Sequence, residues 1–207
     1  MRALLLKTIF MFQAALLAVA GAHAQNTNTP DGLVKFVVED VMTTIKNDKA
    51  IQSGDLRKIN ALVDQKILPY SDFQKTTRLS MGRNWAKATP QQQAQITQEF
   101  KTLLIRIYGG ALAQVKDQKV QYKPFRAAAD ETDVIVKTVV VGKGEPIQLD
   151  YRLEKTAAGW KVYDINILGA WLVESYRNQF NDQVSKGGID GLIKFLQDRN
   201  TALSTNK

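Results

Sequence analysis

Apolar residues recur along this chain at two spacings, and the change between them separates helical from strand-forming segments. Residues 30–116 show helical spacing. Thr29-Pro30-Asp31 is a typical helix start and predicts a first helix that ends near residues 47–48. Ser53-Gly54-Asp55 predicts the start of a second helix. Pro69 then separates it from a short helix over residues 71–81 that ends at Gly82.

The longest predicted helix runs from Thr89-Pro90 to about residue 116. Thr89 fits the N-cap position, Pro90 fits the first helical position, and Gln93 is placed to reach back in a capping box. The pair Gly109-Gly110 interrupts the helix and favours either close packing or a bend. The apolar stripe of this helix comprises Ile96, Phe100, Leu103, Leu104, Ile107, Tyr108, Ala111, Leu112 and Val115.

Beyond residue 118 the apolar spacing changes to two, which is typical of strands. Four strands are predicted, at about residues 119–127, 132–142, 146–155 and 160–168. The turn sequences Gly142-Lys143-Gly144 and Ala158-Gly159 predict hairpins, and therefore an antiparallel sheet. Two helices separated by Gly187-Gly188 follow over about residues 170–199, and residues 201–207 are expected to form a flexible polar tail.

This order of elements predicts a single α+β domain over residues 25–200. A helical part over about residues 30–116 precedes a sheet over about residues 119–168. The expected fold is a curved antiparallel four-stranded sheet covered by helices, in a cone-like (NTF2-like) arrangement with an apolar cavity between sheet and helices. Apolar stripes are also typical of plain core, so the pattern alone does not demonstrate the cavity.

Residues 1–24 have the features of a secretory signal peptide. Arg2 and Lys7 accompany an apolar run, and Ala22-His23-Ala24 matches the small-x-small cleavage pattern. Cleavage would leave 183 residues and lower the formal charge from +8 to +6. Because the chain has no cysteine, a lipid-anchored lipoprotein is excluded. The expected destination is the bacterial periplasm.

Composition removes most of the common catalytic and metal-binding chemistry. The one histidine, His23, lies in the predicted signal peptide, and the chain has no cysteine. A Ser-His-Asp triad, a cysteine nucleophile, a His- or Cys-based zinc site and a His-ligated haem are therefore excluded from the mature chain. The G-x-S-x-G, P-loop and G-x-G-x-x-G motifs are absent. No catalytic residue, metal site or cofactor is predicted.

Carboxylate chemistry and contacts with anions remain open. Asp130, Glu131 and Asp133 are clustered, but such a cluster is more typical of a solvated turn than of a catalytic pair. The positive charge favours an anionic headgroup, an anionic bilayer or an acidic protein, and export argues against nucleic acid. The candidates for headgroup or partner contact are Arg83, Lys87 and Arg152, although basic residues are more often simply solvated.

Two segments carry a family resemblance. Residues 81–92 read MGRNWAKATPQQ, and residues 162–180 read VYDINILGAWLVESYRNQF, followed by GIDGLI at residues 188–193. Together they resemble the MlaC family, also called the toluene-tolerance or Ttg family, over nearly the whole predicted mature chain. The sequence departs from the family pattern at Trp171 and Ser175, where a small polar residue and often an asparagine are expected. An inward-pointing Trp171 would narrow a pocket.

The resemblance implies a periplasmic phospholipid carrier without catalysis. Such carriers move phospholipid between an outer-membrane lipoprotein–porin complex and the MCE-type subunit of an inner-membrane ABC transporter. They maintain outer-membrane lipid asymmetry and meet the membrane only peripherally. The alternatives are a non-carrier periplasmic adaptor and, less favoured, an envelope hydrolase that uses carboxylates. The candidate lipid-binding residues are Phe73, Trp85, Phe100, Leu103, Leu104, Ile107, Tyr108, Val136, Leu149, Tyr151, Val162, Ile165, Ile167, Leu172, Val173 and Tyr176.

Overall fold

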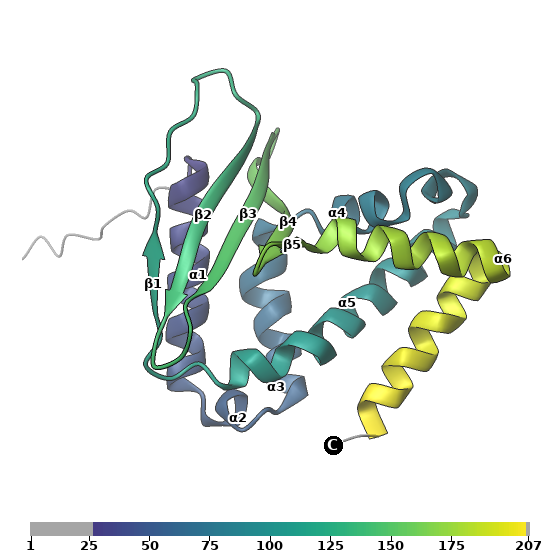
Figure 1. Ribbon diagram of the computed structural model, residues 1–207, viewed down its shortest axis with the longest axis horizontal. Helices are drawn as coiled ribbons and strands as arrows, with labels where there is room; N and C mark the ends of the chain where they lie inside the picture. Colours follow the sequence, from purple (N-terminus) through teal and green to yellow (C-terminus); the bar gives the residue numbers. More distant parts are fainter. Residues whose placement is uncertain (1–26, 206–207) are drawn as a thin grey trace, which may run out of the picture.

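The computed structural model describes residues 27–205, in which a helical part precedes an antiparallel sheet and a long helix closes the chain (Figure 1). The predicted signal peptide lies outside the described residues. The first helical elements are α1 (Pro30–Asn47), α2 (Lys49–Gln52), α3 (Leu56–Leu62), the π-helix η1 (Val63–Ile67) and the 3₁₀-helix η2 (Leu68–Tyr70). They are followed by α4 (Phe73–Met81), the 3₁₀-helix η3 (Gly82–Lys87) and α5 (Pro90–Ala113).

Side-chain caps determine where the first helices begin and end. The Thr29 hydroxyl accepts the Gly32 N–H at 3.2 Å, and Pro30 occupies the first helical position, as predicted. The Asp48 carboxylate accepts the Ala50 N–H at 2.8 Å, so that one residue ends α1 and begins α2. The short α2 had no counterpart among the predicted elements.

The helical chain continues through Pro69, where a break was predicted. Helix α3 passes into η1 and η2, and Pro69 lies in the tight turn of η2, where its fixed φ is tolerated. Helix α4 begins after its cap Asp72, two residues later than predicted, and ends at Gly82, where φ is +55°. Only glycine adopts that conformation at little cost, which explains the predicted end.

The capping box of α5 uses Gln92 and not Gln93, so that part of the prediction is wrong. Gln92 is the third helical residue after Thr89, and its side-chain oxygen accepts the Thr89 N–H at 2.9 Å. Gln93 instead donates to the carbonyl oxygen of Trp85 at 3.0 Å. The helix ends at Ala113, three residues earlier than predicted, and it continues through Gly109-Gly110.

The described residues form a five-stranded antiparallel sheet in the order β1-β2-β3-β4-β5. Its strands are β1 (Lys119–Tyr122), β2 (Asp133–Val141), β3 (Ile147–Thr156), β4 (Gly159–Ile167) and β5 (Ala170–Trp171). The antiparallel arrangement is confirmed, but the sheet has a fifth short strand and its first strand ends five residues earlier than predicted.

The register of the sheet gives it an apolar face and a polar face. Val136 pairs with Tyr151, which pairs with Ile165, and Leu149 pairs with Ile167. Directly paired residues share a face, so these side chains lie on one side, called here the inner face. Helix α1 packs on this face through Leu33 and Val34. The opposite, outer face carries Lys137, Asp150, Arg152, Asp164 and Asn166.

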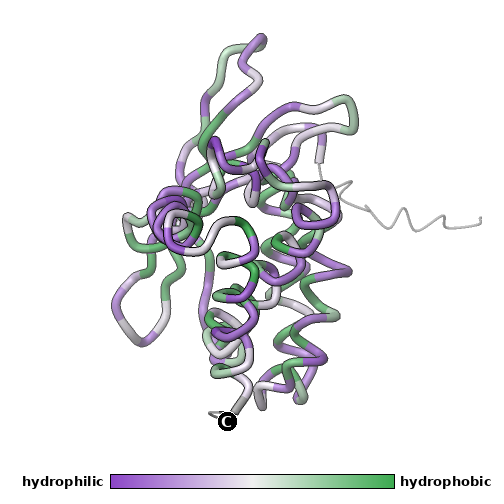
Figure 2. The backbone as a smooth tube through the Cα atoms, turned by 90° about the vertical axis from the view of Figure 1, so that its right-hand side faces the viewer, coloured by the Kyte–Doolittle hydropathy of each residue, from purple (hydrophilic) through white to green (hydrophobic). Residues whose placement is uncertain are grey.

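The closing helix α6 (Leu172–Thr205) contains the predicted break at Gly187-Gly188. Gly188 has φ +66° and ψ −163°, so the two helical halves meet at a kink. Residues 201–205, which were expected to belong to a flexible tail, continue the second half as helix. Hydrophobic and hydrophilic stretches alternate along the helices and strands (Figure 2).

Three apolar clusters hold these elements together. The first joins α4, α5 and α6 around Phe100 and Phe180. The second joins α1, α2, α3 and α5 around Ile45 and Ile59, and the third joins α1 to the sheet around Leu153. In the second, Gly109 faces α3, and a Cβ there would lie in ordinary contact with Ile59 at 3.4 Å, whereas a Cβ at Gly110 would meet no atom within 4 Å.

Candidate functional site

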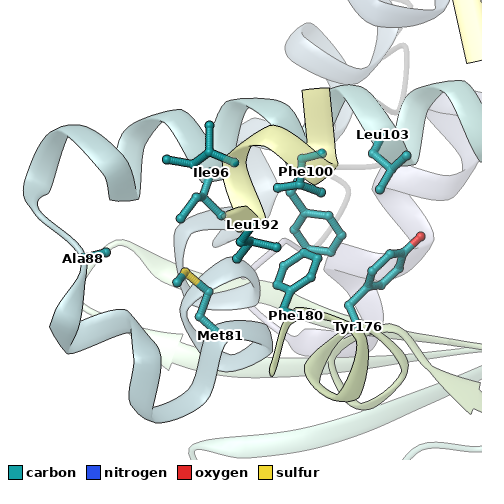
Figure 3. Close-up of a cluster of buried hydrophobic side chains, with 10 residues drawn as sticks. Met81, Ala88, Ile96, Phe100, Leu103, Tyr176, Phe180 and Leu192 are labelled. Atoms are coloured by element: carbon teal, nitrogen blue, oxygen red, sulfur yellow. The ribbon is translucent and has the colours of Figure 1, made fainter. Parts of the chain in front are cut away.

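Five of the candidate lipid-binding residues are buried among the protein's own side chains in this conformation. Phe100 is 0% exposed, and its ring lies 4.7 Å from that of Tyr176 and 5.0 Å from that of Phe180 (Figure 3). These aromatic rings fill the space between α5 and α6 with edge-to-face contacts. The fully packed candidates are Phe100, Leu103, Val136, Val173 and Tyr176.

Two further candidates, Phe73 at the start of α4 and Trp85 in η3, line surface hollows. Phe73 lines a hollow of about 460 Å³ together with Leu68 and Lys161. Trp85 lines a smaller hollow of about 240 Å³ with Lys75 and Arg78. Both rings also pack against the first apolar cluster, so each side chain has a structural role there.

The remaining candidates are incompletely buried apolar side chains of the inner face, α5 and α6. On the sheet these are Leu149, Tyr151, Val162, Ile165 and Ile167. On the helices they are Leu104, Tyr108 and Leu172, together with Ile107, which is 40% exposed. Within residues 27–205, five of these side chains belong to none of the three clusters: Ile107, Tyr108, Leu149, Ile165 and Ile167.

The main contacts of helix α5 are with other helices and not with the sheet, which accounts for the half-buried state of these side chains. The main helix contacts of the sheet come from α1, η2, α4 and α6. The main contacts of α5 are with α2, α3, α4 and α6. Apolar side chains that lack close neighbours make fewer dispersion contacts. The half-buried side chains of the inner face and α5 therefore stabilise the fold less than those of the packed clusters.

Tyr151, in the middle of the inner face, shows the same incomplete filling. Burial raises the pKa of its phenol to about 12, yet the side chain retains accessible surface. Nearby on the inner face, the hydroxyl of Tyr122 is buried and has no hydrogen-bond partner, and burial raises its pKa.

Burial decreases along the inner face of β3 from one end to the other. Leu153 is 0% exposed, Tyr151 and Leu149 are half-buried, and Ile147 is 41% exposed. Leu153 lies in the third cluster against α1, whereas Ile147 follows the β2–β3 hairpin. The inner face of β3 is therefore a row of apolar side chains, called here the apolar track. The track is covered by protein at Leu153 and exposed to water at Ile147.

Of the three basic candidates, Arg152 is already engaged in the fold. Its guanidinium is 3.3 Å from the Asp164 carboxylate and 4.0 Å from the centre of the Trp171 ring. This interaction lies on the outer face, so Trp171 does not narrow the apolar track of the inner face. Arg83 and Lys87 are exposed and form no ion pair within the described chain, although Lys87 donates to the side-chain oxygen of Asn84.

Asp164 connects the sheet to α6. One of its oxygens accepts the Val173 N–H at 3.0 Å near the start of α6, and the other faces Arg152. Burial raises the pKa of Asp164, while these hydrogen bonds and the guanidinium oppose that change. The carboxylate thus caps the start of α6 and pairs with Arg152.

Two of the three clustered acidic residues, Asp133 and Glu131, accept hydrogen bonds within the fold. The Asp133 carboxylate accepts the Tyr163 hydroxyl at 2.8 Å, and Glu131 accepts the Ala128 N–H at 3.2 Å. Within residues 27–205, no group of His, Cys, Asp and Glu side chains is suited to hold a metal ion. None of the described helices is long and apolar enough to cross a membrane.

The candidate lipid-binding residues included none from η1 or α1. Val63 and Ile67 of the π-helix are half-buried, and Val37 of α1 contacts both the second and the third cluster. Single π-turns often occur at functional sites. No apolar spacing distinguishes a π-turn from an α-helix over five residues, so the printed sequence contains no clear signal for it.

These features define an α+β protein whose sheet and helices are joined by packed clusters but leave a half-buried apolar surface between them. The family model described as "MlaC protein" matches residues 35–198, and the chain belongs to this family.

Characterised relatives resemble most of the chain. It is 24% identical over 163 residues to "Toluene tolerance protein ttg2D" from Pseudomonas putida, covering 78% of this chain and 76% of the relative. It is 22% identical over 173 residues to "Intermembrane phospholipid transport system binding protein MlaC" from Haemophilus influenzae, covering 82% and 81%.

A solved structure resembles the fold closely. The phospholipid-binding protein from Ralstonia solanacearum, in complex with a phospholipid, is 56% identical and superposes with a TM-score of 0.82. The match covers 87% of this chain and 98% of that protein.

Proposed function

We propose that this protein binds a phospholipid whose acyl chains lie against the inner face of the sheet and the facing side of α5. The observation that carries this proposal is the set of half-buried apolar side chains outside the packed clusters, above all Leu149, Ile165 and Ile167. The phospholipid bound to the Ralstonia protein supports it, because the two sequences are 56% identical.

The energetics of acyl-chain burial suit such a surface. Each methylene removed from water contributes about 0.8 kcal/mol, so two chains need an extensive dry surface and no reactive group. Acyl chains would also supply the dispersion contacts that α5 and the sheet do not give each other. The headgroup would stay near water, where the exposed Arg83 and Lys87 are candidates for contact with its phosphate or with a partner protein.

In the cell, we propose that the protein is a periplasmic carrier delivered by a cleaved signal peptide. It would exchange phospholipid with an outer-membrane lipoprotein–porin complex and with the MCE-type subunit of an inner-membrane ABC transporter. This exchange would maintain outer-membrane lipid asymmetry. Membership in the MlaC family and the phospholipid transport system after which the Haemophilus relative is named support this assignment. Hand-over of a lipid requires no catalysis.

The proposal is tested by extracting the purified mature protein with organic solvent and measuring phospholipid by mass spectrometry. We expect close to one phospholipid per protein. A protein that contains no phospholipid and takes none up from vesicles would contradict the carrier and favour an adaptor.

A matched pair of variants locates the site. Ile165→Glu places a charge on the inner face, and Ile135→Glu places one on the outer face, where Ile135 is 40% exposed. We expect Ile165→Glu to lose its phospholipid and Ile135→Glu to retain it, because burying a charge against acyl chains is unfavourable. Circular dichroism and melting temperatures verify that both variants fold.

A further inference from the structure

One tyrosine hydroxyl on the inner face of the sheet lacks a hydrogen-bond partner. The Tyr122 hydroxyl is buried, and no group within residues 27–205 forms a hydrogen bond with it. A buried hydroxyl without a partner costs free energy, so native proteins seldom contain one. Tyr163 shows the ordinary situation, because its hydroxyl donates to the Asp133 carboxylate at 2.8 Å. The exception at Tyr122 points to a partner that is not part of the described chain.

Tyr122 belongs to the same cross-strand row as two residues of the proposed lipid surface. Tyr122 pairs with Thr138, which pairs with Leu149. Leu149 in turn pairs with Ile167. Directly paired residues share a face, so all four side chains lie on the inner face. Neighbouring strands are about 4.8 Å apart, so the whole row spans about 15 Å, which is well within the length of one phospholipid.

The polar protein groups around this hydroxyl have other partners. Thr138, directly opposite Tyr122, donates its own hydroxyl to the Leu149 carbonyl at 2.8 Å. The carboxylate of Glu39, whose charge acts on Tyr122 from α1, lies 4.0 Å from the ammonium group of Lys35. A water molecule inside a protein needs two to four polar partners, and the other side chains of the row are mostly apolar.

The Tyr122 hydroxyl is a neutral donor, which narrows the choice of partner. Burial raises the pKa of Tyr122, and the nearby charges of Glu39 and an ionised Tyr151 would raise it further. The phenol therefore keeps its proton at neutral pH and has one hydrogen bond to donate. An anionic acceptor is unfavourable in apolar surroundings, because a buried charge without a countercharge is costly. The fitting partner is an uncharged oxygen acceptor on an otherwise apolar molecule.

We propose that the Tyr122 hydroxyl donates a hydrogen bond to an ester carbonyl oxygen of the bound phospholipid. This inference rests on the proposed function. The ester carbonyls of a diacyl phospholipid are neutral acceptors that lie between the apolar chains and the polar headgroup. The row of Tyr122 suits that position, because Leu149 lies two residues, about 7 Å, inside the water-exposed Ile147. A single polar group in an apolar site fixes the orientation of a ligand, so Tyr122 would determine how deeply the chains enter.

The test compares a diester phospholipid with its diether analogue, which has the same chains and headgroup but no carbonyl oxygen. The delipidated protein is equilibrated in detergent micelles with equal amounts of diester and diether phosphatidylglycerol. Mass spectrometry of the lipid extracted from the repurified protein gives the ratio of the two bound lipids. We expect the wild-type protein to prefer the diester by about fivefold, the factor that a typical net hydrogen bond provides.

Two conservative variants assign this preference to one hydroxyl. Tyr122→Phe removes only the hydroxyl and should bind the two lipids equally. Tyr163→Phe is the matched control, because it removes a hydroxyl that is bonded to Asp133, and it should keep the wild-type ratio. The melting temperature of delipidated Tyr122→Phe should equal or exceed that of the wild-type protein, because the missing hydroxyl has no partner within residues 27–205.

The other outcomes separate this inference from the proposed function. Equal binding of both lipids by the wild-type protein would overturn the inference and leave the proposed function intact. A Tyr122→Phe variant that still prefers the diester would overturn the assignment to this hydroxyl. A lower melting temperature of delipidated Tyr122→Phe would mean that the hydroxyl has a partner in the lipid-free protein, and it would overturn the inference as well. A wild-type protein that binds neither lipid would overturn both proposals.

Discussion

The cluster between α4, α5 and α6 and the open end of the inner face are both apolar, but only the first is filled by its own side chains. Phe100 and Phe180 are 0% exposed and their rings lie 5.0 Å apart, whereas Leu149 and Ile165 remain half-buried. The sequence presents both regions as apolar stripes. The difference shows that apolar spacing predicts the direction in which a side chain points. It does not predict whether other side chains of the protein pack against it.

A protein with an incompletely filled apolar zone depends on packing elsewhere for its stability. The three clusters connect every helix and the sheet, and they bury large side chains almost completely. A phospholipid bound at the half-buried inner face would contact the apolar side chains there as core residues do. Because it would bind only the folded protein, it would stabilise the folded state by mass action. Mutations in the two regions should therefore separate stability from lipid binding.

The largest expected contrast is between Phe100→Ala and Leu149→Ala. Phe100→Ala should lower the free energy of unfolding of the lipid-free protein by about 3–5 kcal/mol, because it leaves a cavity in a close-packed cluster. Leu149→Ala should cost about 1 kcal/mol, because the side chain is only half-buried. Urea denaturation followed by circular dichroism measures both values. Equal losses would mean that the inner face is packed core.

The kink of α6 brings its second half against α5 and so completes the packed cluster. Gly188→Ala should cost about 1–3 kcal/mol, because its φ of +66° and ψ of −163° are essentially restricted to glycine. Gly187→Ala is the control, with φ −140° and no atom within 4 Å of an added Cβ, and should change stability by about 0.5 kcal/mol or less. Thermal denaturation of both variants measures the difference, and a similar loss for both would refute the role assigned to Gly188.

The polar link between sheet and α6 should appear in the pH dependence of stability. Burial raises the pKa of Asp164 above its ordinary value of 3.8. The folded state then binds a proton more strongly than the unfolded state, so stability falls as the pH rises from about 3.8 through the raised pKa. Relative to Asp164→Asn, the wild-type protein should therefore lose stability over that range. Urea denaturation at several pH values tests the sign, and a relative gain would show that Arg152 outweighs burial.

The smallest expected effects concern the glycine pair of α5. Gly110 is exposed, and an added Cβ would meet no atom within 4 Å, so Gly110→Ala should stabilise the helix by about 0.5–1 kcal/mol. Gly109→Ala should gain less, because its Cβ would lie 3.4 Å from Ile59. Melting temperatures of the two variants provide the comparison. A larger gain at Gly109 would indicate that α3 is free to move away from α5.

Local chemistry made much of the fold predictable. The alternation of Leu149, Tyr151 and Leu153 identified β3, and Thr29 and Gly82 marked helix ends that the structure confirms. The capping residue of α5 was also recognised, although its reciprocal partner Gln92 was not. Short elements such as α2, η1 and β5 escaped prediction because a few residues show no periodicity.

The division of the candidate site into packed and open residues was not predictable. Phe100 and Ile107 belong to one stripe of α5, yet the first is 0% and the second 40% exposed. Arg152 resembles a free cation in the sequence but pairs with Asp164 and Trp171 across the outer face. Both outcomes depend on distant segments of the chain, and the spacing of residues along one element carries no information about them.

The most direct test of the difference between the two regions is photocrosslinking with a phospholipid that carries a diazirine on one acyl chain. After binding and irradiation, mass spectrometry of proteolytic fragments identifies the labelled residues. We predict labelling on the inner face of β3 and β4, around Leu149, Ile165 and Ile167, and on α5 around Ile107 and Tyr108. Labelling confined to the hollows beside α4, at Phe73 and Trp85, would contradict the assignment of the open apolar zone as the lipid site.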